Sequence, residues 1–372
     1  MSTPSPSSVV YLITGASRGL GRAIATVAAE KRRRCVATSP NNNEDGNGSF
    51  RGSSRPRFLL VARSAEGLEE TKRELLAAAA DKTTNPTPLL VPETDVLCRS
   101  MNLSDLDRLD SNIDTLLDDT TRLSLEQRRE DEEEEDRTNG GGSKTRQHLV
   151  LVNNAASLGH LGPAWKNGPS LEDMRRTIDF NVTGSLWMSV RFAMYAKDRA
   201  RLLHQEQQQQ QQPLPPNHPH HHPEQPPPTG PLPSSMAATI VNVSSLAAVT
   251  PAFPGMGIYS VGKAARDRYH TLLARQEDDD DDDEESTTTT TPVVIRPKYL
   301  NYAPGPLTTD MTQRLRTSTE TLSDGFRSQF DPENLVDPRE SARKLLDLLE
   351  TDDFESGSHV DYYDLVSERS SG

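Results

Sequence analysis

The sequence has little of what a disulfide-stabilised or membrane protein requires. Only two cysteines, Cys35 and Cys98, occur in 372 residues, too few for a disulfide framework in so long a chain. No stretch approaches the roughly 18 consecutive apolar residues of a transmembrane helix. The first residues, MSTPSPSSVVYLITGAS, also lack the basic segment and apolar stretch of a signal peptide. We therefore expect a cytoplasmic protein in a reducing compartment.

Hydrophobic and aromatic residues are also scarce, at 33% and 5% of the chain, so part of it is expected to lie outside any core. The net charge of −14 comes largely from two acidic runs, at 130–136 and 277–285, which together hold sixteen acids. Without those sixteen acids the net charge of −14 becomes +2, so the acidic balance says nothing about the substrate. No basic stripe with interleaved aromatic residues appears, and we expect no nucleic-acid partner.

Four segments of low complexity interrupt the chain. The segment 38–57 is rich in Asn, Gly and Ser, and 127–147 is rich in acids. The segment 203–235 is rich in Gln, Pro and His, and 276–292 is rich in Asp and Thr. Such segments bury too little to offset the entropy of ordering them. We expect disordered insertions in the surface loops of a single domain spanning 8–366. Prolines break the histidine tract at 218–222, which lacks fixed ligand geometry, and we expect no metal site there.

The remaining residues alternate between two kinds of pattern. Short apolar runs, typical of buried strands, lie at 9–14, 58–62, 149–155, 238–245 and 299–305. Longer helical patterns lie between them at 18–33, 65–80, 170–197 and 259–275. This alternation predicts an α/β fold of Rossmann type, with a doubly wound parallel sheet and helices on both of its faces.

The first predicted strand runs directly into a glycine-rich turn, TGASRGLG, followed by a helix. This order predicts a cradle for the pyrophosphate of a dinucleotide. Gly15 allows a tight turn, Gly19 lets the backbone approach the phosphates, and Gly21 allows close packing of the helix. The alternative is a glycine-rich loop that binds nothing.

The end of the second strand indicates which dinucleotide is bound. An acid there would bind the ribose 2′-hydroxyl of NADH, whereas an arginine accommodates the 2′-phosphate of NADPH. The segment FLLVARS contains Arg63 and no acid, and Arg18 in the glycine-rich turn offers a second positive charge. We therefore predict NADPH, with a solvated surface arginine as the alternative interpretation of Arg63.

A tyrosine and a lysine stand four residues apart in the segment GIYSVGKAARD. In a helix this spacing places Tyr259 and Lys263 on one face, although a tyrosine packed under a lysine stem has the same spacing. The apolar strand TIVNVSS, which ends at Ser245, favours chemistry, because ligands of doubly wound sheets lie at the carboxyl ends of strands. Lys263 would favour the phenolate and hold the nicotinamide ribose, and Ser245 would orient a carbonyl. Tyr259 would then donate a proton to the carbonyl oxygen as hydride reaches the carbon.

The glycine spacing G-x-x-x-G-x-G, together with the serine, tyrosine and lysine, resembles the short-chain dehydrogenase/reductase superfamily. The segment LVNNAAS resembles its N-N-A-G motif, with Ala156 in place of the usual glycine, and implies that Asn153 and Ala155 close the adenine side. The segment TIDFNVTG offers Asn181, which by the same resemblance supports a water-mediated proton relay to Lys263. Asn181 is alternatively an ordinary polar residue of a helix.

Three further segments, YLNYAPGPLTTDM, YSVGKAARD and FESGSHVDYYD, resemble the sepiapterin reductase family, short-chain enzymes that reduce the side-chain carbonyls of pterins with NADPH. The resemblance implies a homodimer and tetrahydrobiopterin biosynthesis. It also implies that Asp361 accepts hydrogen bonds from the pterin and that Leu246 and Gly305 line the substrate. The cofactor contacts that it implies are Ser17, Leu20, Ser64, Asn102, Leu103, Leu307, Thr309, Asp310 and Met311.

The chain departs from the family pattern at two places. Between Ser245 and Tyr259 it holds one residue more, which would reshape the pocket wall. The adenine-contacting pair after the third strand is either Asn102 with Leu103 or Asp95 with Val96. We favour Asn102 because the residues after it lead into a helix with acids in its first turn.

Two rival functions stay open at this point. One is a general carbonyl or diketone reductase of the same superfamily, in which Asp361 is idle. The other is a non-catalytic NADPH-binding scaffold, whose Gln/His/Pro and acidic tracts recruit partners.

Overall fold

A computed structural model describes residues 8–37, 56–79, 91–138, 146–163, 168–210, 235–279, 295–318 and 324–367. Its centre is a seven-stranded parallel sheet with the strand order β3-β2-β1-β4-β5-β6-β7. The strands are β1 Ser8–Thr14, β2 Arg57–Ala62, β3 Val96–Ser100, β4 Arg146–Asn153, β5 Ser235–Val243, β6 Lys298–Ala303 and β7 His359–Asp361. The order reverses between β1 and β4, and this switch point is where doubly wound sheets bind ligands.

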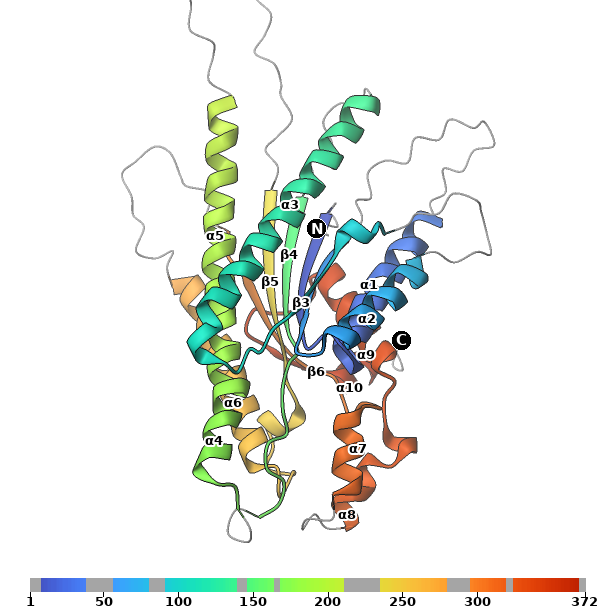
Figure 1. Cartoon of the computed structure of the whole chain (residues 1–372), viewed down its shortest axis with the longest axis vertical. Coiled ribbons are helices and arrows are strands. Elements are labelled where there is room, and N and C mark those ends of the chain that lie inside the picture. Colours follow the sequence, from blue (N-terminus) through green and yellow to red (C-terminus); the bar gives the residue numbers. More distant parts are fainter. Residues whose placement is uncertain are drawn as a thin grey trace, which may run out of the picture.

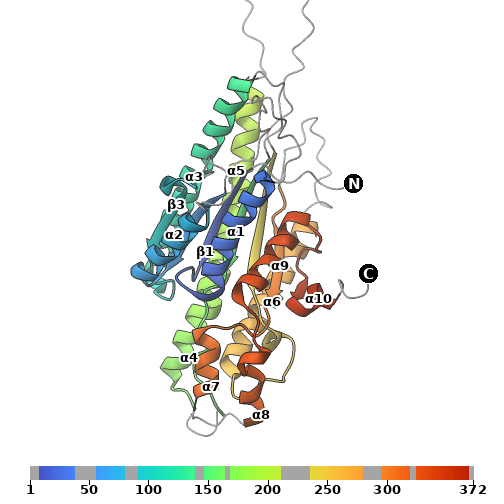
Figure 2. The same ribbon diagram turned by 90° about the vertical axis from the view of Figure 1, so that its right-hand side faces the viewer.

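Helices cover both faces of the sheet, as Figures 1 and 2 show. One face carries α1 Gly19–Ala37, α2 Ala65–Ala79 and α9 Pro338–Thr351, and the other carries α3 Leu109–Thr138, α5 Gly184–Gln210 and α6 Gly257–Asp279. The shorter helices are α4 Leu171–Ile178, α7 Asp310–Thr317, α8 Asp324–Arg327 and α10 Tyr362–Ser367. The predicted fold class, a doubly wound parallel sheet covered on both faces, is confirmed.

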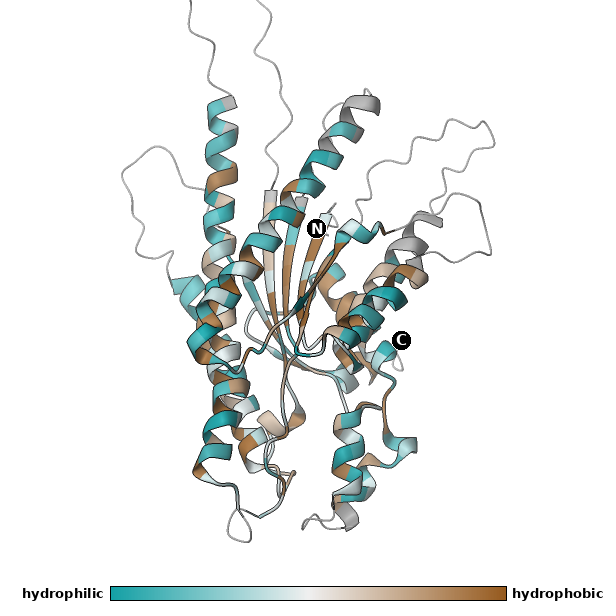
Figure 3. Ribbon diagram, viewed as in Figure 1, coloured by the Kyte–Doolittle hydropathy of each residue, from teal (hydrophilic) through white to brown (hydrophobic). Residues whose placement is uncertain are grey.

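Three apolar clusters hold these layers together. The first lies between the sheet and α1, α2 and α9, and the second lies between the sheet and α3, α5 and α6. Because the central strands are buried on both faces, their middle residues form apolar runs, and Figure 3 shows the middle of the sheet mostly in hydrophobic colours. The third cluster surrounds Tyr259 and includes Leu158, Met256, Leu315 and Phe330. It packs α6 against the segment that follows β6.

Two strands of the sheet, β3 and β7, correspond to none of the predicted apolar runs. The edge strand β3 (VLCRS) is largely half-buried, and β7 has only three residues, all half-buried. Neither is long or apolar enough to stand out as a buried strand. Among the described residues, no helix combines the length and the apolar character needed to cross a bilayer.

Three of the segments expected to be loop insertions begin as helix. Helix α3 continues to Thr138, α5 to Gln210 and α6 to Asp279. Some of their acids are paired: Glu130 Oε1 lies 2.9 Å from Arg57 Nη2, and Glu277 Oε2 lies 2.6 Å from Lys197 Nζ. The rest of each segment, including the histidines at 218–222, lies outside the described residues, except that 146–147 and 235 already belong to β4 and β5.

The four predicted insertions share one place in the topology. Each runs from the end of a helix to the start of a strand, namely from α1 to β2, α3 to β4, α5 to β5 and α6 to β6. In a parallel sheet these connections lie at the amino edge, whereas ligands bind at the carboxyl edge. A strand of six or seven residues separates the two edges by about 20 Å. We therefore propose that the insertions are dispensable for the chemistry.

Replacing residues 213–232 by a Gly/Ser linker of about ten residues tests this proposal. We expect activity within about twofold of the parent and a Tm within about 2 °C, because loop closure entropy changes slowly with loop length. A longer deletion that starts at His204 is the comparison, because it also removes Glu206, whose Oε2 lies 2.9 Å from Arg128 Nη1. A collapse of folding in the shorter deletion would show that the segment packs against the core.

Candidate active site

The glycine-rich turn between β1 and α1 has the geometry that its sequence predicts. Gly15 and Gly19 have φ of +67° and +56°, which residues with a Cβ rarely adopt. A Cβ on Gly21 would lie 2.5 Å from the Gly15 carbonyl oxygen, so only glycine allows α1 to begin so close to β1. The first backbone N–H groups of α1, which begins at Gly19, have no partner within the helix. This turn therefore fits a phosphate group.

The three other predicted residues of this turn take different positions. Ser17 accepts a hydrogen bond at its carbonyl oxygen from Arg22 Nη2, at 2.6 Å. The side chain of Leu20 is buried in the apolar cluster between the sheet and α1, so a contact with the cofactor would have to use its backbone. Arg18 is exposed, and its Nη1 lies 2.6 Å from Asp310 Oδ2 at the start of α7.

Asn154, a residue that the sequence did not single out, fixes the turn from the neighbouring strand. Its Nδ2 donates to the carbonyl oxygens of Thr14 and Gly15, at 3.0 and 3.1 Å. The hydroxyl of Thr14 in turn accepts from the backbone of Asn154 and Ala155, both at 3.1 Å. Asn153 instead points inward and donates to Ser189 Oγ at 2.8 Å. Ala155, a predicted cofactor contact, thus lies beside the turn, whereas Asn153, the other predicted contact, has a buried side chain.

The ends of β2 and β3 carry the residues expected to select the cofactor. Arg63 is exposed, with its guanidinium carbon 6.0 Å from the centre of the Phe180 ring. Ser64 Oγ accepts from Gly67 N at 3.1 Å, at the start of α2. Asn102 and Leu103 follow β3 at its carboxyl end.

Asp95, the alternative to Asn102, lies at the opposite end of β3. It is buried, and its Oδ1 lies 3.0 Å from Nε of the equally buried Arg57. The structure therefore leaves Asn102 as the candidate for the adenine contact, because it lies at the ligand edge of the sheet.

Ser245, Tyr259 and Lys263 come together at the carboxyl end of β5. The Lys263 ammonium lies 5.6 Å from the centre of the Tyr259 ring, and both side chains are buried on one face of α6. Lys263 Nζ donates to the Val243 carbonyl oxygen, at the end of β5. A side-chain hydrogen bond joins Ser245 to Tyr259. The two residues four apart therefore share one site with the serine, as the sequence predicts.

Burial acts in opposite senses on the charges of the pair. It lowers the pKa of Lys263 well below 10.5, and the nearby Arg266 guanidinium lowers it further. Burial also raises the pKa of Tyr259, while the hydrogen bond from Ser245 and the charge of Arg266 lower it. Both shifts favour neutral side chains, so the phenol keeps its proton near neutral pH. Such a group can donate a proton to a substrate.

Arg266 is a second residue beside the site that the sequence patterns do not single out. It is fully buried on α6, and its guanidinium donates to the carbonyl oxygens of Asn153 and Ala155. Burial lowers its pKa to about 10. Only its spacing from Lys263 on the helix was available as a signal, and an arginine at such a position is usually exposed.

Asn181 lies on a turn of π-helix, Asp179–Thr183, between α4 and α5. The side chain is buried, and its amide exchanges two hydrogen bonds with the backbone of Ser157: Nδ2 donates to the carbonyl oxygen at 2.7 Å, and Oδ1 accepts from N at 2.8 Å. A Cβ on Gly262, the neighbour of Lys263, would lie 3.2 Å from the Asn181 Cβ. Asn181 thus lies beside α6, and its role in a proton relay stays a prediction.

The segment after β6 borders the glycine-rich turn. A Cβ on Gly19 would lie 3.3 Å from Thr309 Cγ2, which places Thr309 against the proposed phosphate cradle. Leu307 is buried and pairs with Val336 in a short parallel bridge. Met311 packs against the apolar cluster that contains Tyr259. These predicted residues therefore lie between the cradle and the tyrosine.

The predicted substrate residues surround the same edge. Gly305 has a φ of +76°, and a Cβ there would lie 3.5 Å from Tyr362 Cδ1. Asp361 pairs with Ala303 across β6 and β7, and burial raises the pKa of its carboxyl group. Its Oδ1 accepts from Tyr363 N at 2.9 Å. Leu246, directly after Ser245, is an exposed apolar side chain.

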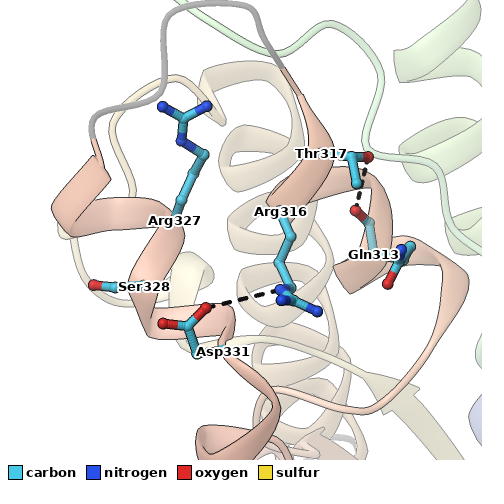
Figure 4. A pocket seen from close by; sticks show the side chains of 6 residues that line it. All are labelled: Gln313, Arg316, Thr317, Arg327, Ser328 and Asp331. Atoms are coloured by element: carbon cyan, nitrogen blue, oxygen red, sulfur yellow. Dashed lines mark hydrogen bonds and ion pairs between the residues drawn. The ribbon is translucent and has the colours of Figure 1, made fainter.

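A separate hollow of about 370 Å³ lies beside α7 (Figure 4). It is lined by Gln313, Arg316, Thr317, Arg327, Ser328 and Asp331. Across it, Arg316 Nε lies 3.9 Å from Asp331 Oδ1. None of the predicted site residues lines this hollow, so it is distinct from the edge that holds Tyr259.

A doubly wound sheet, a glycine-rich turn after β1 and a serine, tyrosine and lysine brought together after β5 are features that this chain shares with the short-chain dehydrogenases/reductases, a class of oxidoreductases. Solved structures share the fold. The KRED1-Pglu enzyme has a TM-score of 0.51 at 19% identity, and the alignment covers 94% of this chain and 99% of that one. The 3-oxoacyl-[acyl-carrier protein] reductase from Brucella melitensis, in complex with NAD, has a TM-score of 0.53 at 17% identity, covering 97% and 96%.

Within that class the chain is similar to sepiapterin reductases. The enzyme of Rattus norvegicus is 29% identical over 365 residues, which cover 96% of this chain and 97% of the relative. That of Xenopus laevis is 27% identical over 359 residues, covering 96% of both chains. A shorter match to the enzyme of Meriones unguiculatus is 41% identical over 131 residues, 35% of this chain and 43% of the relative. No family model matches the chain.

Proposed function

We propose that the protein reduces a carbonyl group with NADPH, and that the substrate is the side-chain keto group of a pterin. The arrangement of Ser245, Tyr259 and Lys263 beside the glycine-rich turn carries the proposal. In this arrangement Tyr259 would act as a proton donor at the edge of the sheet where doubly wound folds bind dinucleotides. The similarity to sepiapterin reductases supports the substrate class and a role in tetrahydrobiopterin biosynthesis.

The residues present fit a nicotinamide dinucleotide. The positive φ of Gly15 and Gly19 and the free N–H groups of α1 suit its pyrophosphate. Arg63 would hold the 2′-phosphate, Asn102 the adenine and Lys263 the nicotinamide ribose. When bound, the dinucleotide supplies the hydride.

The side chains of the site perform the proton chemistry. Ser245 hydrogen-bonds and orients the substrate carbonyl, which brings its oxygen to the Tyr259 hydroxyl. Tyr259 then donates its proton to that oxygen as charge develops on it. Lys263, when it carries its proton, would stabilise the phenolate that remains, because the two groups lie in a buried site where water screens the charges weakly. Asn181 would support the return of a proton to Lys263 through water.

A direct comparison of substrates tests the proposal. NADPH oxidation is followed with sepiapterin and with simple diketones, in parallel. We expect a clear preference in kcat/KM for sepiapterin. Reduction of the diketones alone would instead favour the general carbonyl reductase, and a lack of reduction of both, with NADPH still bound, would favour the non-catalytic scaffold.

The cofactor prediction is tested by Arg63→Ala. We expect the Kd for NADPH to rise roughly 10-fold to 100-fold, the scale of a lost charge-assisted hydrogen bond, with little change for NADH. The control is Arg73→Ala, which removes an exposed arginine from α2. A parent enzyme that prefers NADH would show that the end of β2 was misinterpreted.

We further propose that two copies associate through α5 and α6. These helices pack together, with Lys197 and Glu277 paired between them. Their outer side carries exposed large apolar residues at intervals of whole helical turns. These residues are Trp187, Met194 and Leu202 on α5 and Val261 and Leu272 on α6. Such a self-complementary face fits the twofold symmetry of a homodimer.

A further inference from the structure

One buried carboxylate, that of Asp267, joins the three elements that build the site. It lies on α6, one turn after Lys263, and is largely shielded from solvent. Its Oδ1 accepts from Ser244 Oγ at 2.5 Å and from Asn242 Nδ2 at 2.8 Å, both on the β5 side. Its Oδ2 lies 2.6 Å from Nδ1 of His359 on β7. Ser244 directly precedes the proposed catalytic serine.

His359 connects this carboxylate to the substrate side of the site. It stands two residues before Asp361 on β7, and residues two apart on a strand face the same side of the sheet. A second contact holds the same segment, because Thr271 Oγ1 donates to the Gly357 carbonyl oxygen at 2.8 Å. In the described sheet the three-residue strand β7 pairs with β6. These two side-chain contacts, together with the close approach of Gly357 to Thr271 and Ala274, hold this segment over α6.

We propose that His359 is a positioning residue, which in its protonated form binds Asp267 and holds Asp361 where it can recognise a pterin. The inference rests on the proposed function and adds a pH dependence to it. A general carbonyl substrate, which makes no use of Asp361, would not be affected.

The charges around His359 set the direction of this dependence. Asp267 faces it from α6, Asp361 from its own strand and Asp364 from α10, while β6 contributes Asn301, which does not titrate. The hydrogen bond to Asp267 and these carboxylates raise the pKa of His359 above 6.5, although partial burial opposes them. The stabilisation from the ion pair is therefore complete below about pH 6.5 and is lost as the pH rises through the raised pKa.

The experiment measures kcat/KM for sepiapterin and for a small diketone between pH 5.5 and 9. The value for sepiapterin is divided by the value for the diketone, because this ratio cancels the titration of groups that both reactions use, such as Tyr259 and Lys263. In the parent enzyme we expect the ratio to fall by about fivefold as the pH rises. His359→Asn keeps a donor near the position of Nδ1 without a charge, and the fall should disappear. His359→Leu removes the donor, and the ratio should be low at every pH.

A matched control, His204→Asn, replaces a histidine near the C-terminal end of α5 that is not part of the proposed site. This variant should keep the pH dependence of the parent. The inference is overturned if His359→Asn retains the fall, or if His359→Leu lowers both substrates equally, as a purely structural role would. Failure of the proposed function looks different, because the parent enzyme itself would then not reduce sepiapterin at any pH.

Discussion

Tyr259→Phe should lower the turnover of sepiapterin by at least about 100-fold while the Kd for NADPH stays within about twofold. The substitution removes one oxygen atom, the proposed proton donor, and leaves the ring in its apolar cluster. The hydroxyl is not expected to anchor the cofactor, so binding and chemistry should separate. Single-turnover kinetics and the quenching of protein fluorescence by NADPH measure the two quantities.

The control for this variant lies on the same helix. Tyr269→Phe removes a hydroxyl from a half-buried tyrosine of α6 that is not part of the site, and its turnover should match that of the parent. Turnover of Tyr259→Phe within tenfold of the parent would refute the assignment of the proton donor. A large loss of NADPH affinity would show that the hydroxyl also holds the cofactor.

Asp361→Ala should lower kcat/KM for sepiapterin by roughly 30-fold to 1000-fold, and kcat/KM for a small diketone by less than about threefold. A carboxylate that faces a pterin accepts hydrogen bonds from its amino group and ring nitrogen. Without it, those donors would be left unsatisfied. A diketone has no such donors, so the two substrates separate recognition from chemistry.

A pH dependence and a control variant make this test more specific. Burial raises the pKa of Asp361, so pterin recognition should weaken as the pH falls through that raised value. Asp353→Ala, at an exposed position in the loop before β7, is the matched control. Equal losses on both substrates would indicate a structural role for Asp361, and no loss on either would favour the broad carbonyl reductase.

The sequence was sufficient for the fold class and for the three residues at the centre of the site, because these depend on local patterns. A buried parallel strand such as β2 is an unbroken apolar run. The glycine-rich turn is recognisable because glycines stand at the positions that adopt a positive φ. Tyr259 and Lys263 share a helix, so their spacing alone fixes their relation. The edge strands β3 and β7 do not stand out as apolar runs, because they are largely half-buried.

The missed residues depend on contacts between distant parts of the chain. Asn154 fixes a turn that lies about 140 residues earlier, and Asp267 meets His359 across 92 residues. No spacing along the sequence marks such pairs, since each residue taken alone resembles an ordinary polar side chain. The expectation that the acidic runs lie in disordered loops was partly wrong for the same reason. Glu130 pairs with a buried arginine of β2, which composition alone does not show.

The π-helical turn at Asp179–Thr183 makes this part of the chain unusually sensitive to length. Each residue of an α-helix advances it by about 100°, and a π-turn behaves as one residue inserted into an α-helix. Removing a single residue here would convert the turn to a regular helix. The residues of the turn, Asn181 among them, would then move relative to Ser157, although helix propensity and hydrophobicity would hardly change. At this turn the number of residues, more than their identity, determines which side chain faces the catalytic helix.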